Sequence, residues 1–162
     1  MYSIVYVCTG NTCRSPMAEG ILRTLLSQKG IEDVDVTSAG IGTLDGYPAT
    51  QHAVEISRRH QIDISGHHST RMTERIFREA DLVFALAENH FDALKNMPGA
   101  EQKLFMVKAY PESGHNDTRH SVDDPVGGTL EEYKTTFEEI YSEIKRALPE
   151  VIRRIEHHRQ AS

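Results

Sequence analysis

The sequence has 162 residues and a formal net charge of −6 at pH 7, which suits one domain with a sizeable core and argues against a nucleic-acid partner. No segment approaches the ~18 apolar residues of a transmembrane helix, and the N-terminus lacks the charged and apolar regions of a signal peptide, so we expect a cytoplasmic protein that binds no membrane. Two cysteines give no disulfide framework, and nine scattered histidines form no ligand cluster, so we expect no metal and no other cofactor.

The first predicted element is a buried strand over residues 4–7, which are apolar and either β-branched or aromatic. A loop over residues 8–15 follows, and then a helix that ends near Gly30 and repeats apolar residues at helical spacing, namely Met17, Ile21, Leu22, Leu25 and Leu26. We expect Ser15 to cap this helix and Pro16 to be its first residue, because the N–H that proline lacks would have no partner there. The loop therefore ends at a helix N-terminus, where main-chain N–H groups and the helix dipole form a site for an anion.

The residues of this loop suit a nucleophile that faces an anion. Gly10 permits the positive φ that such a turn usually needs, and Asn11 tolerates it. Cys8 begins the loop, and a thiol at a helix N-terminus beside an arginine has a pKa of about 3.5 to 7.5 instead of about 8.5. We therefore expect an ionised Cys8 at neutral pH and an Arg14 guanidinium that binds two phosphate oxygens. The alternative is a buried structural cysteine before an ordinary turn, which Arg14 and the adjacent serine disfavour.

The rest of the chain alternates short apolar segments with helical patterns. The predicted strands cover residues 34–38, 81–87 and 103–107, and the predicted helices cover residues 49–60, 72–80, 88–97 and 130–148. The last helix opens with a capping box at Thr129 and Glu132, and Pro149 should kink or interrupt it. Residues 111–128 are polar and rich in proline and glycine, so we expect a long loop of the kind that is usually functional or disordered.

This order of elements predicts the fold class and the place of the site. Strands that alternate with helices indicate an α/β fold with a parallel sheet and helices on both faces. No linker or repeat divides residues 1–162, so we expect a single domain. Ligands of such sheets lie beyond the carboxyl ends of the strands, which places the site between the strand before Cys8 and the strand that ends at Ala87.

Residues 4–17 resemble the low-molecular-weight protein tyrosine phosphatase family, whose signature is a cysteine, five residues, an arginine and a serine near the N-terminus. A second family element, an acid followed by proline, is present as Asp124-Pro125. The resemblance implies a three-layer sandwich with strand order 2-1-3-4, a phosphorylated protein as substrate, and hydrolysis through a phosphocysteine. It also assigns a phosphate-binding loop made of Thr9, Gly10, Asn11, Thr12, Cys13 and Ser15 between Cys8 and the helix.

A leaving group expelled by thiolate attack on phosphorus needs a proton, so a carboxylic acid must reach it. Asp124 is the candidate, because Pro125 biases it toward an extended conformation on the loop and the resemblance places the general acid there. The alternative is a residue that only forms a turn. Asp123 could supply a second negative charge, or it could be a solvated loop residue.

Other polar residues match positions that the family uses to support the loop. The resemblance implies that Ser15 donates a hydrogen bond to the thiolate, and that Asn11, Ser38 and His67 brace the loop. Each of these three residues alone would be an ordinary polar loop residue. The pair His67-His68 leaves the histidine assignment open, and Thr70 replaces an arginine common in relatives, which predicts weaker bracing.

The residues expected to select the substrate are Thr12, Asp123 and Val126. Tyrosine-directed relatives commonly carry aromatic residues after the Asp-Pro pair, whereas this sequence has Val126-Gly127-Gly128 and no tryptophan. With Thr12, this pattern is similar to the bacterial branch that removes phosphate from protein arginine. A phosphoarginine guanidinium could also pair with Asp124 and Asp123. We therefore favour phosphoarginine, with phosphotyrosine as the alternative.

Two other function classes fit the sequence less well. Arsenate reductases share this fold and loop but need further cysteines to relay a disulfide, and none follows Cys13. A phosphate-binding module without catalysis would need neither a nucleophile nor a distant acid. The spacing of Cys8 and Cys13 suggests that peroxide inactivates the protein by oxidising Cys8 to a disulfide with Cys13, and that a dithiol reductant reverses this. The sequence does not indicate an oligomeric state.

Overall fold

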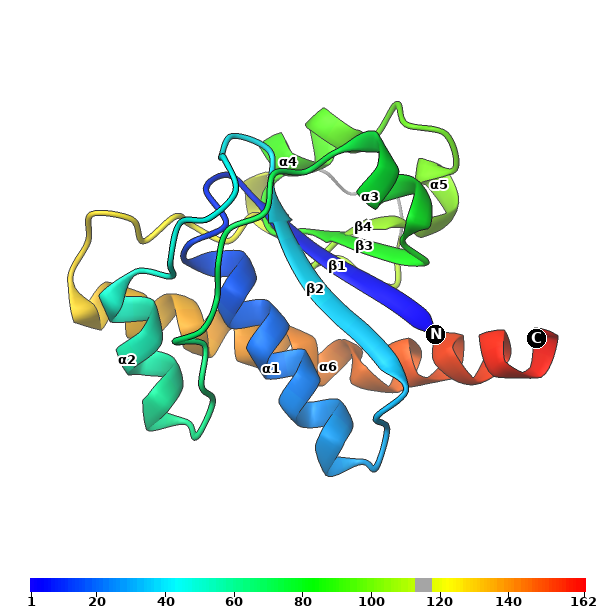
Figure 1. Ribbon diagram of the computed structural model, residues 1–162, viewed down its shortest axis with the longest axis horizontal. Helices are drawn as coiled ribbons and strands as arrows, with labels where there is room; N and C mark the ends of the chain where they lie inside the picture. Colours follow the sequence, from blue (N-terminus) through cyan, green and yellow to red (C-terminus); the bar gives the residue numbers. More distant parts are fainter. Residues whose placement is uncertain (113–117) are drawn as a thin grey trace.

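A four-stranded parallel sheet forms the centre of the computed structural model, which describes residues 1–112 and 118–162 (Figure 1). Its strands are β1 (Tyr2–Cys8), β2 (Val34–Gly40), β3 (Leu82–Ala85) and β4 (Leu104–Met106), in the order β2-β1-β3-β4. This confirms the α/β fold and the strand order that the resemblance implied. Cys8 pairs with Gly40 in the register of β1 and β2, so the nucleophile lies at the carboxyl edge of the sheet.

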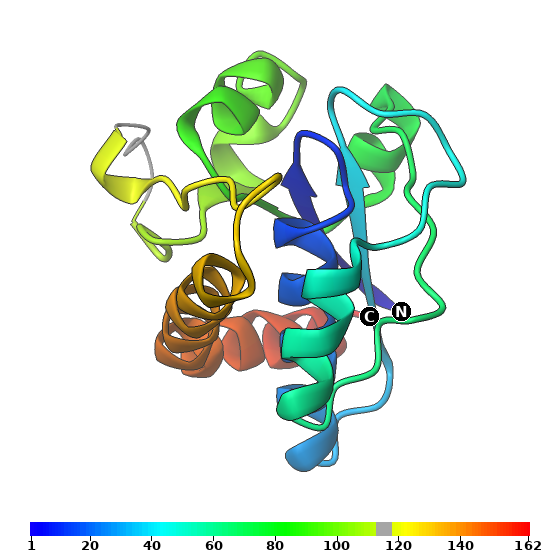
Figure 2. The same cartoon turned by 90° about the vertical axis from the view of Figure 1, so that its left-hand side faces the viewer.

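Helices cover both faces of this sheet and make it the middle of three layers (Figures 1 and 2). One face carries α1 (Arg14–Gln28), α2 (Gln51–Arg59) and α6 (Leu130–Ala161), and the other carries α3 (Glu74–Glu79), α4 (Glu88–Leu94) and α5 (Ala100–Lys103). Alternate residues of β1 serve the two layers: Ile4 and Tyr6 join the core with α1 and α6, whereas Val5 and Val7 join the second core with Phe77. A central strand buried on both faces explains why residues 4–7 are continuously apolar.

Helix α1 begins differently from the prediction. Its N-cap is Cys13, and Arg14 is its first residue, so the prediction of Ser15 as N-cap and Pro16 as first residue is wrong. The reason is that the Ser15 hydroxyl bonds to Cys8 and Asn11, at the base of the loop. Pro16, the third helical residue, is tolerated there because its missing N–H would also have no intrahelical partner.

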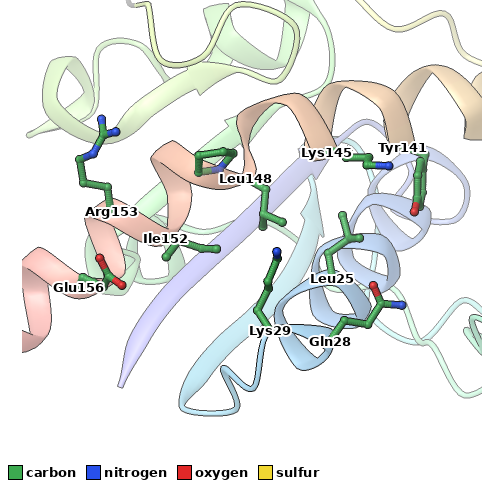
Figure 3. Close-up of a pocket in the computed structure, with 10 residues that line it drawn as sticks. Leu25, Gln28, Lys29, Tyr141, Lys145, Leu148, Ile152, Arg153 and Glu156 are labelled. Atoms are coloured by element: carbon green, nitrogen blue, oxygen red, sulfur yellow. The ribbon is translucent and has the colours of Figure 1, made fainter.

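Helix α6 runs without an interruption through Pro149, so of the two predicted outcomes, a kink or an interruption, the structure fits the kink. Its axis does change direction: in Figure 2 the orange first half is seen nearly end-on, and the red second half runs across the view. A groove of about 700 Å³ lies between α6 and the end of α1, and Leu25, Leu148 and Pro149 are among the residues that line it (Figure 3). This groove holds none of the predicted site residues, so its size does not make it the candidate active site.

The remaining differences concern short elements. Helix α5 precedes β4 and was not expected, and a 3₁₀ turn, η1 (Thr118–His120), lies within the predicted loop 111–128. Residues 113–117 of that loop lie outside the described residues. Of the helices that the structure describes, none has the length and apolar character to span a bilayer.

Candidate active site

The loop between β1 and α1 is shaped by Asn11. Asn11 has a φ of 56°, whereas Gly10 is not among the described residues with positive φ, so Asn11 takes the conformation expected of Gly10. The Asn11 amide nitrogen donates to Ser15 Oγ at 2.8 Å and Ser38 Oγ at 2.9 Å. Its amide oxygen accepts the Thr70 N–H at 2.8 Å. This fully buried side chain therefore ties the loop to α1, to β2 and to the chain after His67.

Two further contacts complete this support. His67 Nε2 lies 2.7 Å from the Asn11 carbonyl oxygen, which can only accept, so Nε2 carries the hydrogen. The structure thus brings His67 to the loop, whereas His68 is exposed. The Ser38 hydroxyl donates to Glu19 at 2.8 Å. Because Thr70 contacts the loop through its main chain, this contact needs no arginine side chain.

Gly40 lets the loop approach β2 closely. A Cβ atom at Gly40 would lie 2.6 Å from the Thr9 carbonyl oxygen and 3.0 Å from Asn11 Cβ. The Gly40 main chain in turn accepts the Met72 N–H and donates to the Thr70 carbonyl oxygen. Any larger residue would push the loop away from the end of the sheet.

Cys8 is 2% exposed and lies at the bottom of the loop. Its sulfur is 2.8 Å from Ser15 Oγ and accepts the Asn11 N–H at 3.3 Å. Burial raises the pKa of the Cys8 thiol, while the Ser15 hydroxyl, the Arg14 charge and the Asn11 N–H lower it. The prediction of a lowered pKa is therefore wrong, because burial outweighs the three groups that stabilise the thiolate.

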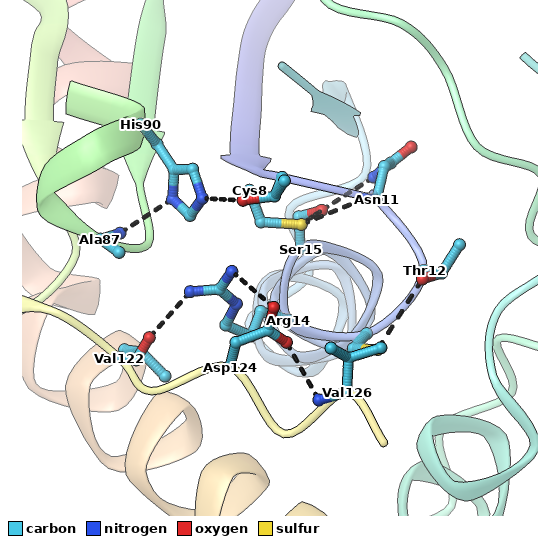
Figure 4. Close-up of polar contacts among 12 residues, drawn as sticks. Cys8, Asn11, Thr12, Arg14, Ser15, Ala87, His90, Val122, Asp124 and Val126 are labelled. Atoms are coloured by element: carbon cyan, nitrogen blue, oxygen red, sulfur yellow. Dashed lines mark hydrogen bonds and ion pairs between the residues drawn. The ribbon is translucent and has the colours of Figure 1, made fainter. Parts of the chain in front are cut away.

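Arg14 is 5% exposed and lies among His90, Val122 and Asp124 (Figure 4). One guanidinium nitrogen donates to the Val122 carbonyl oxygen at 2.9 Å, and another lies 3.4 Å from Asp124 Oδ2. The Val122 contact fixes the plane of the guanidinium, so its remaining N–H groups, which lie in that plane, can bind an anion in a defined orientation.

Asp124 is distant from the loop in the sequence but lies beside it in the structure. Its Oδ1 atom accepts the Val126 N–H at 3.0 Å, which holds the carboxylate in place, and its side chain is 42% exposed. A pocket of about 160 Å³ lies between the loop and this segment, lined by residues 8–14 together with Asp124 and Val126. The structure thus brings Thr12, Val126 and Asp124 to one pocket, whereas Asp123 is exposed and is not among its lining residues.

Cys13 belongs to a different hydrogen-bonded group from Cys8. Its sulfur lies 3.2 Å from Tyr133 Oη and 3.7 Å from Thr50 Oγ1, and both cysteines are free thiols. Burial raises the pKa of Tyr133 to about 12, so its hydroxyl keeps its hydrogen at neutral pH. A disulfide between Cys8 and Cys13 stays a prediction. Its formation would break the contact between the Cys13 sulfur and the Tyr133 hydroxyl.

Sequence reasoning missed His90, the third residue of α4. His90 is fully buried, accepts the Ala87 N–H at Nδ1 and lies 2.9 Å from Thr9 Oγ1 through Nε2. Its position just after β3, at the carboxyl edge of the sheet, was the signal that could have identified it.

The geometry is that of a cysteine-based phosphate site, and the comparison of sequences identifies its family. The sequence model of the family described as low molecular weight phosphotyrosine protein phosphatase matches residues 3–161. The chain belongs to this family. It is therefore a low-molecular-weight protein phosphatase, a hydrolase.

Individual relatives of this phosphatase carry two kinds of name. The protein-arginine-phosphatase of Bacillus subtilis is 37% identical over 152 residues, which cover 93% of this chain and 97% of the relative. A crystal structure of a low-molecular-weight protein tyrosine phosphatase from T. tengcongensis matches with a TM-score of 0.81 at 37% identity, covering 93% and 99% of the two chains. A cysteine-to-serine mutant of the YwlE arginine phosphatase with a phosphorylated active-site serine matches with a TM-score of 0.80 at 35% identity, covering 93% and 95%.

Proposed function

We propose that this phosphatase hydrolyses phosphoarginine in proteins through a phosphocysteine at Cys8. The observation that carries the proposal is the composition of the pocket. Thr12 and Val126 line it, and none of its nine lining residues is aromatic. A phenyl ring gains most from aromatic or broad apolar walls, whereas a guanidinium is cationic and pairs with a carboxylate. The B. subtilis relative named protein-arginine-phosphatase supports the same substrate.

The first step transfers the phosphoryl group to Cys8. The bound phosphate dianion takes up the proton of the thiol, and the sulfur attacks phosphorus while the Ser15 hydroxyl and Asn11 N–H stabilise its negative charge. Arg14 and the loop N–H groups bind the equatorial oxygens. The P–N bond breaks, and protonated Asp124 gives its proton to the departing nitrogen, which leaves as a guanidinium group.

The second step regenerates the thiol. Asp124, now ionised, takes a proton from a water molecule, which attacks phosphorus and breaks the S–P bond. The phosphate returns to the Cys8 thiolate the proton that it took up in the first step, and it leaves as the monohydrogen dianion. A YwlE structure with a phosphorylated serine in place of the cysteine supports a phosphorylated residue at this position.

Phosphotyrosine is the second candidate substrate, because the T. tengcongensis neighbour at the same 37% identity is named a protein tyrosine phosphatase. Matched peptides that carry either phosphoarginine or phosphotyrosine at one position test the two directly. We expect kcat/KM for the phosphoarginine peptide to exceed that for the phosphotyrosine peptide. The reverse order would assign the protein to the tyrosine phosphatases.

A further inference from the structure

Thr9 and His90 form a contact that the two proposed steps do not use. His90 is fully buried beside the loop (Figure 4), and its Nε2 atom lies 2.9 Å from the Thr9 hydroxyl oxygen. On the other side of the ring, Nδ1 accepts the Ala87 N–H at 3.0 Å. The ring therefore connects the start of α4 to the residue after the nucleophile.

These contacts fix the hydrogen on the histidine. Nδ1 must present a lone pair to the Ala87 N–H, so it carries no hydrogen. Burial and the nearby Arg14 charge lower the pKa of His90 to about 3, so the ring is neutral at physiological pH. The single ring hydrogen is then on Nε2, and His90 donates it to the Thr9 oxygen.

The direction of this bond leaves the Thr9 hydroxyl hydrogen unused. The hydrogen cannot return to Nε2, and within residues 1–112 and 118–162 the Thr9 hydroxyl has no hydrogen-bond partner besides His90. Thr9 lines the phosphate pocket, while its methyl group lies 3.3 Å from the position that a Cβ of Gly42 would take. A hydroxyl with no acceptor among the described residues therefore belongs to a residue that lines the pocket.

We propose that the Thr9 hydroxyl donates to a phosphoryl oxygen in the pocket, and that His90 is the positioning residue that aims this hydroxyl. The proposal rests on the phosphatase function proposed above. In this role His90 stays neutral and donates only from Nε2. It does not act as an acid, because a proton on Nδ1 would displace the Ala87 N–H. The donor acts on the phosphoryl group alone, so the effect is independent of whether the leaving group is arginine or tyrosine.

The test measures kcat and KM for 4-nitrophenyl phosphate, and the affinity for inorganic phosphate by calorimetry. Thr9→Val removes the hydroxyl at equal size, and His90→Phe removes both ring nitrogens. We expect each to lower kcat/KM about tenfold, since a hydrogen bond to an anion is lost, and to weaken phosphate binding in parallel. The double variant should be within about twofold of Thr9→Val, because His90 acts through Thr9.

Conservative variants separate positioning from a general structural role. Thr9→Ser keeps the hydroxyl, and His90→Gln keeps one donor and one acceptor, so both should retain kcat/KM within about threefold. His157→Phe, at an exposed position of α6, is the matched control for ring substitution. The pH profile of kcat/KM for His90→Gln should superimpose on that of the wild type.

Wild-type turnover in Thr9→Val would overturn the proposal, as would additive losses in the double variant or a shifted pH profile in His90→Gln. If His90→Phe does not fold, the Thr9→Val and Thr9→Ser pair still decides whether the hydroxyl is a donor. If the wild type released no phosphate from any substrate, the proposed function would fail. Weaker phosphate binding by Thr9→Val than by the wild type would then still support the donor, and equal binding would contradict it.

Discussion

A guanidinium nitrogen of Arg14 lies 3.4 Å from Asp124 Oδ2 in the lining of the pocket, so the proposed phosphate-binding group contacts the proposed general acid. Arg14 is nearly buried and held by the Val122 carbonyl oxygen, whereas Asp124 is 42% exposed on a loop. We expect an entering phosphoryl group to compete with the Asp124 side chain for Arg14. Asp124 is then free to turn toward the leaving group.

Asp124→Asn should slow turnover according to the leaving group. The amide cannot donate a carboxylic proton, so kcat falls about 10² to 10⁴-fold for a poor leaving group and much less for 4-nitrophenolate. Steady-state rates with a series of aryl phosphates measure this dependence. Asp123→Asn, next to it but outside the pocket, is the matched control and should stay within about twofold of the wild type. An equal loss across the series would show that Asp124 is structural.

Ser15→Ala should raise the pKa of Cys8 further. The Ser15 hydroxyl lies 2.8 Å from the Cys8 sulfur and lowers the pKa of the thiol against the effect of burial. Loss of a hydrogen bond to a thiolate costs about 1.5 kcal/mol or more, so alkylation at a fixed neutral pH slows about tenfold. The measurement is the rate of iodoacetamide modification of Cys8 against pH, by mass spectrometry. Ser27→Ala, at the far end of α1, should leave the profile unchanged, and an unchanged profile in Ser15→Ala would contradict the assignment.

Thr12→Ile should shift the substrate preference toward the aryl group. The longer aliphatic side chain removes a hydroxyl from the pocket mouth and adds apolar surface, and each change amounts to about 1 to 3 kcal/mol. The ratio of kcat/KM for phosphoarginine over phosphotyrosine peptides therefore falls at least about tenfold. Thr12→Val, which changes polarity but not size, separates the two contributions. A constant ratio in both variants would show that Thr12 does not determine the substrate preference.

His90 should make the protein less stable in acid. Its pKa is about 3 in the folded protein and about 6.5 in an unfolded chain, so below pH 6.5 the unfolded chain binds a proton that the folded protein does not. The free energy of unfolding attributable to this group falls by about 2 kcal/mol between pH 7 and pH 5. Urea unfolding of the wild type and His90→Gln at both pH values measures the difference, because the other groups cancel. Equal losses in the two proteins would mean that His90 is not held neutral.

Local sequence patterns predicted which residues the structure brings together in the candidate site. Cys8, Arg14 and Asp124 belong to short patterns whose spacing implies a loop at a helix N-terminus and an acid before a proline. The parallel sheet followed from apolar strands that alternate with helices, and the structure confirms it. The assignment of Ser15 as a cap failed because a tertiary contact with Cys8 takes its hydroxyl.

Residues that act across the fold could not be predicted from local patterns. In the sequence Gly40 only follows a predicted strand. The structure shows why a side chain is excluded there, because the Thr9 carbonyl oxygen lies too close. His90 is one of nine histidines, and its neutral state follows from burial and from the Ala87 N–H. The raised pKa of Cys8 depends likewise on how completely the loop buries the sulfur, which the sequence alone does not specify.

The central claim is that Cys8 carries the phosphoryl group taken from arginine. The most direct measurement mixes the wild-type protein with a phosphoarginine peptide, quenches within the first turnover and locates the phosphoryl group by mass spectrometry. We expect phosphate on Cys8 that forms and decays at rates consistent with turnover, and no turnover in Cys8→Ala. Absence of the adduct, together with unchanged phosphate release by Cys8→Ala, would contradict the account.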